Sequence, residues 1–176
     1  MDCEILVVLN DEVPFDSALG DRLRTLAGAV LVDQGVKAPA ELNLILISAA
    51  EMTELNGEHM GHEGPTDVLS FPIDDDPDSI PDGEVRLVGD VVLCPEVAAA
   101  NAPTHAGSFE DECALLLVHG CLHLLGFDHR DLAEEAAMWT RERELIERHW
   151  GQFSLDPWRP VERLDQRGSF NSGEPS

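Results

Sequence analysis

The segment S-F-E-D-E-C-A-L-L-L-V-H-G-C-L-H-L-L-G-F-D-H, from Ser108 to His129, contains the signals of a helix start, a buried helix and a helix end. Its serine, followed three residues later by Asp111, is typical of a capping box at the start of a helix. The apolar run from Ala114 to Val118 predicts that this helix is buried. The helix should continue to Leu125, because Gly126 can adopt the left-handed conformation that ends it. We therefore expect a central helix followed by a reversal of the chain.

Three histidines at the end of this predicted helix have the spacing of a metal site. His119 and His123 are four residues apart, so both project from one face of a helix, and such a pair is a common set of zinc ligands. After the reversal at Gly126, His129 can return as a third ligand. Three neutral nitrogens leave a fourth position open, which is typical of a catalytic zinc ion. We predict one Zn²⁺ per chain, although imidazole also suits nickel, copper and iron.

The same stretch departs from the metalloprotease pattern H-E-x-x-H-x-x-G-x-x-H at one position. Gly120 stands where that pattern has a glutamate, which is the general base of peptide hydrolysis. Ordinary proteolysis is therefore not the expected activity. Asp128, beside the third histidine, is the nearest carboxylate that can assist catalysis, or it orients a histidine instead. Glu112 lies one heptad before His119 on the ligand face, with a solvent-side or capping role as the alternative.

The rest of the chain predicts a small sheet covered by helices, of the α/β or α+β class. Short apolar runs predict strands at residues 5–9, 42–47, 68–73 and 88–94. Pro72 lacks a backbone donor, so its strand should lie near an edge. Periodicity and capping residues predict helices at residues 15–35, 48–56, 95–100, 108–125 and 132–150. The last helix should bury a stripe formed by Leu132, Ala136, Trp139, Ile146 and Trp150.

Length and composition predict a single acidic domain. The chain has 176 residues and a formal net charge of −24, with 35 acidic against 11 basic side chains. This argues against broad adhesion to nucleic acid by charge alone. The four cysteines lack C-x-x-C spacing, which favours buried, reduced thiols. We find no signal-peptide pattern and no apolar run near the roughly 20 residues that cross a bilayer, so we expect a cytoplasmic protein without a membrane partner.

Two segments are expected to be irregular. Residues 74–84 form an acidic stretch that lacks the glycine of a calcium-binding loop, and we interpret it as a mobile loop. Beyond Gly151 the composition turns to Pro, Gly, Ser and Arg. We therefore expect one catalytic domain over residues 1–151 and a largely disordered tail over residues 152–176.

H-G-C-L-H-L-L-G-F-D-H, from His119 to His129, resembles the hallmark of the YbeY family, which are metal-dependent endoribonucleases. Leu55-Asn56 followed by P-T-D-V-L-S-F-P at residues 65–72 is similar to the family's second block. L-V-G-D-V-V-L-C at residues 87–94 is similar to its third. The resemblance covers about residues 40 to 150. It implies an α+β fold with a mixed four-stranded sheet, a cleft over the metal, and zinc held by the three histidines.

The resemblance also implies a function. It predicts a single-strand-specific, zinc-dependent endoribonuclease in 16S rRNA 3′-end maturation and ribosome quality control. The implied partners are single-stranded RNA and the ribosome with its small-subunit rRNA, and no DNA is expected. Because the chain is so acidic, we expect ribosome docking to deliver the substrate. Two alternatives stay open: a non-catalytic ribosome-assembly factor with a structural metal, and another metal-dependent hydrolase.

The second block supplies further candidate site residues. The catalytic candidates are Asp67 and Asp128, and the substrate-binding candidates are Thr66, Ser70 and His59. For Thr66 and Asp67 the alternative is turn chemistry at a loop-to-strand junction. Many relatives carry an arginine where this chain has Met60, and methionine cannot replace a fixed cation at a phosphate.

Overall fold

Four strands form one mixed sheet in the order β1-β2-β4-β3. In the computed structural model, β1 (Ile5–Asp11), β2 (Ala40–Leu46) and β4 (Arg86–Leu93) run parallel to one another. β3 (Val68–Pro72) runs antiparallel to β4 and forms one edge. The α+β class and the edge position of the Pro72 strand are therefore confirmed. The structure describes residues 4–61 and 64–158, without the side chains of His59 and Met60.

Within the described residues, five α-helices accompany the sheet, as predicted. They are α1 (Ser17–Asp33), α2 (Ala49–Met60), α3 (Pro95–Asn101), α4 (Phe109–Leu124) and α5 (Leu132–His149). α2 is one turn longer than predicted. Two short 3₁₀ helices, η1 (Pro77–Ser79) and η2 (Ala102–Thr104), were not predicted, and η1 lies in the acidic segment that we interpreted as a loop.

Polar side chains start four of these helices. In each, the side chain at the N-cap accepts a hydrogen bond from the backbone N–H three residues later, which satisfies a donor that the helix itself leaves unpaired. The pairs are Asp16 with Leu19, Ser48 with Glu51, Ser108 with Asp111, and Asp131 with Glu134. The predicted caps at Ser48 and Ser108 are confirmed.

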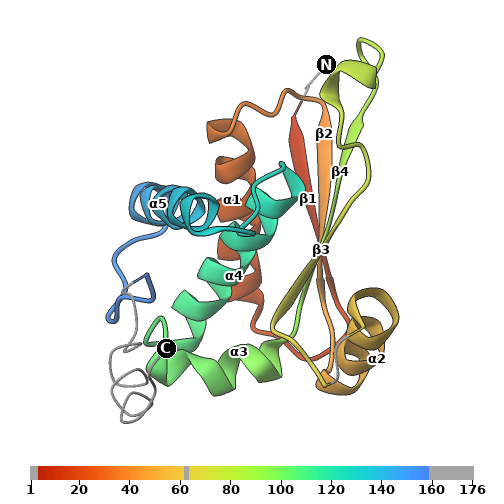
Figure 1. Cartoon of the computed structure of the whole chain (residues 1–176). Coiled ribbons are helices and arrows are strands. Elements are labelled where there is room, and N and C mark those ends of the chain that lie inside the picture. The colour runs from red at the N-terminus through yellow and green to blue at the C-terminus, as the bar shows by residue number, and fades with distance from the viewer. Residues whose placement is uncertain (1–3, 62–63, 159–176) are drawn as a thin grey trace, which may run out of the picture.

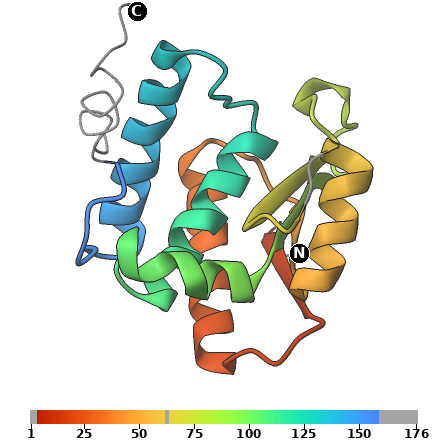
Figure 2. The same ribbon diagram turned by 60° about the horizontal axis from the view of Figure 1, so that its bottom comes forward.

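The two faces of the sheet are covered unequally. α1 and α4 pack on one face and form the main core with it, whereas α2 lies at one end of the other face (Figure 1). A second, smaller apolar cluster lies under α2 and includes Ile47, Met52 and Val92. Figure 2 shows α4 between α5 and the sheet, so α4 is buried on nearly all sides. The predicted central helix is confirmed.

The segment after α5 folds back onto the domain. Phe153 and Trp158 pack against the main core with their rings stacked 5.4 Å apart, and the N–H of Leu155 donates to the carbonyl of Ala106. The packed part of the chain thus extends beyond the boundary at Gly151 that composition suggested. The rest of the predicted tail, residues 159–176, lies outside the described residues.

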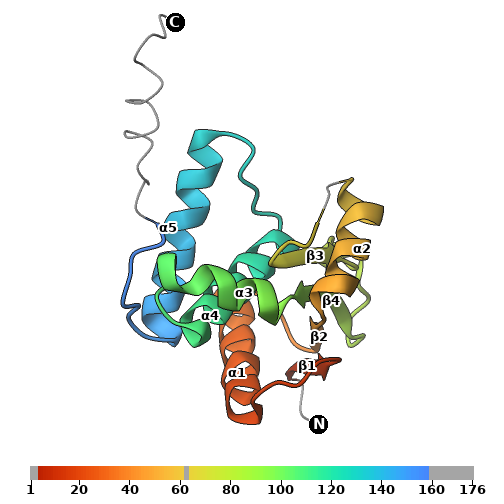
Figure 3. The ribbon, with the colours of Figure 1, turned by 90° about the horizontal axis from the view of Figure 1, so that it is seen from below.

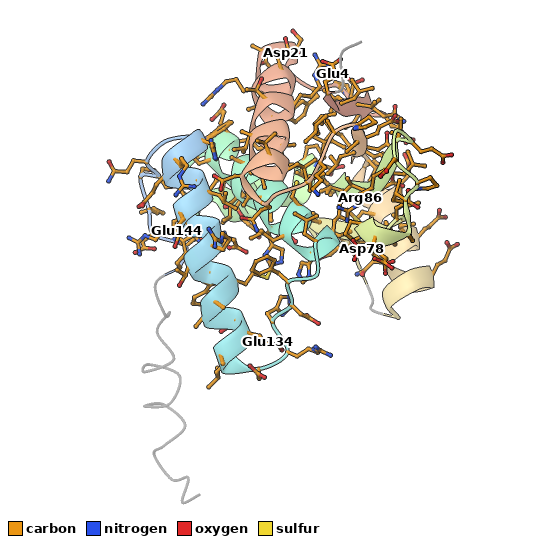
Figure 4. All side chains as sticks on the ribbon, turned by 90° about the horizontal axis from the view of Figure 1, so that it is seen from above. Glu4, Asp21, Asp78, Arg86, Glu134 and Glu144 are labelled. Carbon is orange, nitrogen blue, oxygen red and sulfur yellow. The ribbon has the colours of Figure 1, made fainter. Side chains whose placement is uncertain are left out.

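The surface carries most of the acidic side chains. Figure 4 shows Asp21 on α1, and Glu134 and Glu144 on α5, all at the periphery of the molecule. In residues 4–61 and 64–158, no helix combines the length and the apolar character that crossing a membrane requires.

Candidate metal centre

His119 and His123 lie one turn apart near the C-terminal end of α4. Both are partly exposed, while Val118, Gly120 and Leu122 between and beside them are buried. Nε2 of His123 lies 3.1 Å from Nε2 of His119. The two rings therefore project from the one open face of an otherwise buried helix, as the four-residue spacing predicts.

The chain reverses directly after α4 at Gly126. Its N–H donates to the carbonyl of His123 at 3.1 Å, and the N–H of Phe127 donates to that of Leu122 at 3.0 Å. These two bonds form a Schellman motif, which favours glycine in the left-handed conformation, and Gly126 has a φ of 100°. The connection that follows leads from α4 to α5 (Figure 3) and carries His129.

The turn brings the ring of His129 to the other two. Its centroid lies 5.6 Å from that of His119 and 5.0 Å from that of His123, and one nitrogen of each ring lies within 4.8 Å of the others. Burial, together with repulsion from the two other rings, lowers the pKa of His123, so its ring is neutral at neutral pH. Neutral imidazoles are donors to zinc and related ions. The three histidines can therefore hold a metal ion.

The cysteines within the described part of the chain offer no competing ligands. Cys113 and Cys121 lie in α4 and are fully buried, and burial raises the pKa of each thiol to about 12. Such thiols stay protonated, whereas the thiolate is the form that binds metal. The prediction of buried, reduced cysteines is confirmed for these two and for Cys94.

Glu142 of α5 holds the ring of His119 in place through its Nδ1 atom. Its Oε2 lies 2.5 Å from Nδ1 of His119, and its Oε1 accepts the indole N–H of Trp158 at 3.1 Å. The carboxylate is buried, with an exposed fraction of 3%. A carboxylate on Nδ1 selects the tautomer whose lone pair is on Nε2, the nitrogen nearest to His123. One side chain thus links α4, α5 and the C-terminal segment at this centre.

Gly120 lies on the opposite side of α4, against the sheet. A Cβ at this position would lie 2.7 Å from Cγ1 of Val91 and 3.2 Å from Oγ of Ser70. The hydroxyl of Ser70 also donates to the carbonyl of Gly120 at 3.1 Å. Helix and sheet are in close contact here, so packing accounts for glycine where a metalloprotease has glutamate.

A cleft of about 750 Å³ lies over the three histidines. It brings them together with four of the other predicted site residues, which are Thr66, Asp67, Ser70 and Asp128. The side chain of the fifth, His59, lies outside the described residues. Sequence reasoning did not predict site roles for the other polar and aromatic groups that line the cleft: Asn56, His105, Trp139, Glu142 and Trp158. Among the described residues, no lysine or arginine lines it.

The two candidate catalytic carboxylates are held differently. Asp128 accepts the backbone N–H of His129 at 2.8 Å and pairs with Arg130 at 3.0 Å. The first of these contacts is the main reason that its pKa is lowered, so Asp128 is a weak base near neutral pH. Asp67 faces the cleft with its Oδ1 3.4 Å from the hydroxyl of Thr66. A catalytic role for either stays a prediction.

Comparison with known proteins agrees with this arrangement. A family model described as "Endoribonuclease YbeY" matches residues 9–149. A relative of that name from Frankia casuarinae is 47% identical over 130 residues, which is 71% of this chain but only 65% of the relative. One from Salinispora tropica is 44% identical over 135 residues, 72% of this chain and 85% of the relative.

A solved structure extends the similarity to the fold. The solution structure of TM1509 from Thermotoga maritima matches with a TM-score of 0.57 and 25% sequence identity. The match covers 97% of this chain and 96% of that one. On the family model, the curated relatives and the shared fold, this chain belongs to the YbeY family.

Proposed function

We propose that this chain is a single-strand-specific, zinc-dependent endoribonuclease. It acts in the cytoplasm, in 16S rRNA 3′-end maturation and ribosome quality control, with the ribosome as partner. One observation carries the proposal: His119, His123 and His129 converge in a cleft, and among the described residues no fourth protein ligand joins them. Structural zinc sites have four protein ligands, whereas catalytic sites have three. The endoribonuclease names of the relatives support RNA as the substrate.

The residues around the proposed metal ion have different roles. Zinc, when bound by the three imidazoles, supplies a Lewis acid for a phosphoryl oxygen or lowers the pKa of a bound water towards ~7. Glu142 keeps His119 in the tautomer that can bind it. Asp67 and Asp128 are the carboxylates on the cleft wall that can move a proton. Ser70 holds β3 against α4 through its bond to Gly120.

Glu142→Gln is expected to lower metal affinity and kcat/KM by about 10–100-fold. The amide keeps the size of the side chain but loses the negative charge that supports His119. Competition with a chromophoric chelator measures affinity, and an RNA cleavage assay measures kcat/KM. The matched control is Glu144→Gln on the same helix, where the carboxylate is exposed and pairs with Arg141 at 3.0 Å. Equal effects of the two variants would contradict the role of Glu142.

The cleft offers aromatic rings on which unpaired bases can stack. Trp139 and Trp158 line it, and bases of single strands stack on such rings with about 1–3 kcal/mol each. The net charge of −24 opposes binding of a polyanion. Docking on the ribosome would replace intrinsic affinity by a high local concentration. Free oligonucleotides should therefore be poor substrates, and strong, salt-insensitive cleavage of them would contradict this account.

Trp139→Ala is expected to raise KM for single-stranded RNA on the order of tenfold, because a stacking surface is removed. The metal group is untouched, so kcat should change little. Trp139→Phe keeps an aromatic ring and should restore most of the loss. Steady-state kinetics on one labelled RNA compares the three proteins. If both the alanine and the phenylalanine variants have the KM of the wild type, the proposed stacking of a base on Trp139 is wrong.

A substrate panel tests the proposed function. Zinc-loaded protein is incubated with single-stranded RNA, duplex RNA, single-stranded DNA and peptides, with His123→Ala as the control for contaminating nucleases. Cleavage restricted to single-stranded RNA, and lost in the variant, is the expected result. RNA cleavage that persists in the variant, or cleavage of peptides alone, would contradict the proposal.

A further inference from the structure

A second histidine–carboxylate pair lies in the wall of the same cleft. Nδ1 of His105 is 2.8 Å from Oε2 of Glu112, and the other carboxylate oxygen, Oε1, accepts the backbone N–H of Ala106 at 3.0 Å. His105 follows η2 and lines the cleft, whereas Glu112 lies in the first turns of α4. Neither residue belongs to the three-histidine group.

Glu112 is the buried member of this pair, and His105 is the partly exposed one. The side chain of Glu112 has an exposed fraction of 0%, and its two partners are the imidazole of His105 and one neutral amide. A buried carboxylate is stable in its charged form only with a paired cation. Among the described residues that line the cleft there is no lysine or arginine to supply it. The imidazolium of His105 is therefore the cation.

Other negative charges near His105 also favour its protonated form. The hydrogen bond to Glu112 is the main cause that raises the pKa of His105, and the negative charges of Asp67 and Glu142 add to it against the opposing effect of burial. These groups face the ring from α4, from the loop before β3 and from α5. The ring of His105 thus has acidic side chains around it from three parts of the structure.

The ring is also open to a ligand. The side chain of His105 has an exposed fraction of 44%. With Nδ1 bound to Glu112, Nε2 is a second donor, and within the described part of the chain it has no hydrogen-bond partner. A charged N–H donor that is open to a cleft can form a charge-assisted hydrogen bond to a phosphate oxygen.

We propose that the imidazolium of His105, held by Glu112, binds the phosphodiester backbone of single-stranded RNA at a subsite apart from the three-histidine group. This proposal rests on the proposed function, because it names how that cleft attracts its substrate. His105 offers a polyanion a positive charge from the wall of the cleft, separate from the three histidines proposed to hold the metal ion.

His105→Asn is the first test. Asparagine keeps a donor towards Glu112 but has no charge and no donor at the Nε2 position. KM for single-stranded RNA should rise on the order of tenfold at low salt with kcat nearly unchanged. The slope of log KM against log salt concentration should fall by about 0.7, the loss of one phosphate contact. The matched control is His149→Asn, because His149 pairs with Asp33 at 2.7 Å outside the cleft.

The dependence on pH supplies a readout that a structural role would not give. In the wild type, KM should be low below the pKa of His105 and rise as pH passes through it, because the imidazolium is lost. His105→Asn should have the high KM at every pH. Glu112→Gln should shift the rise in KM to lower pH, because the ring then lacks the counter-ion that raises its pKa. NMR titration of the ring should give a pKa above ~6.5 in the wild type.

The outcomes separate this proposal from the proposed function. If the wild type cleaves RNA and His105→Asn keeps the KM, salt slope and pH profile of His149→Asn, the phosphate subsite is wrong and the proposed function stands. If the wild type does not cleave RNA, the proposed function fails, and anisotropy with the same intact labelled RNA measures binding directly. Binding that is absent, or equal in the two asparagine variants, would then overturn the subsite as well.

Discussion

His123→Ala is expected to lose bound metal and to cleave single-stranded RNA on the order of 1,000-fold more slowly than the wild type. Two imidazoles remain where three converged, and the ion is worth several kcal/mol of transition-state stabilisation. The zinc content, measured by elemental analysis, should fall from about one zinc per chain to a trace. The rate is measured on the best RNA substrate of the panel, with both proteins prepared in parallel.

The control and the stability measurement decide between catalysis and a structural metal. His149→Ala removes a histidine that is bonded to Asp33 in the last turn of α5, and it should retain wild-type cleavage. Urea unfolding of His123→Ala should match that of the metal-free wild type, since the ring is partly exposed and other contacts remain. If rRNA processing is lost only in variants that fail to fold, the metal is a structural staple and our account is wrong.

Gly120→Glu is expected to destabilise the fold by about 4 kcal/mol or more. The variant restores the metalloprotease sequence pattern, but the new Cβ would lie 2.7 Å from Val91 and the carboxylate would be buried between α4 and the sheet. Overpacking costs about 1–3 kcal/mol, and an unpaired buried charge adds several more. Since most domains are stable by about 5–15 kcal/mol, this loss removes a large part of the free energy of unfolding and should lower the midpoint of denaturation clearly. It should gain no peptidase activity.

A matched pair of alanine substitutions isolates the packing effect. Gly28 lies within α1, and a Cβ at this position would meet nothing within 4 Å. Gly28→Ala should stabilise the protein by about 0.5–1 kcal/mol through helix propensity. Gly120→Ala has the same propensity gain, but it should be net destabilising because Val91 and Ser70 must move. Chemical denaturation gives both values, and a stabilising Gly120→Ala would contradict the close contact.

The elements that could be predicted from the sequence are those whose signal is local. The N-caps of α2 and α4, the Pro72 edge strand and the glycine turn at Gly126 follow from backbone chemistry within a few residues. The three-histidine group was predictable for the same reason. A helix spacing of four and a turn at Gly126 are enough to bring its rings together.

The contacts that could not be predicted join distant segments. Glu142 is 23 residues from His119 and is one of several glutamates on α5, so no spacing distinguishes it. The predicted stripe of α5 was partly wrong: Leu132 is 74% exposed and Ala136 is also exposed, whereas Met138 and Leu145 are buried beside Glu142. A glutamate in phase with those two apolar residues was the available signal. Glu112 is a second case. The sequence allows it a place on the ligand face, a solvent-side role or a capping role, but the structure buries it fully against His105.

X-ray absorption at the zinc edge of the zinc-loaded protein identifies the ligands of the ion. His119, His123 and His129 together should bind one ion and leave a coordination position free. The expected spectrum contains three imidazole nitrogens at about 2.0–2.1 Å with no sulfur neighbour, and one imidazole fewer in His123→Ala. A shell that contains sulfur, a fourth protein ligand, or an unchanged spectrum in the variant would rule out this metal site.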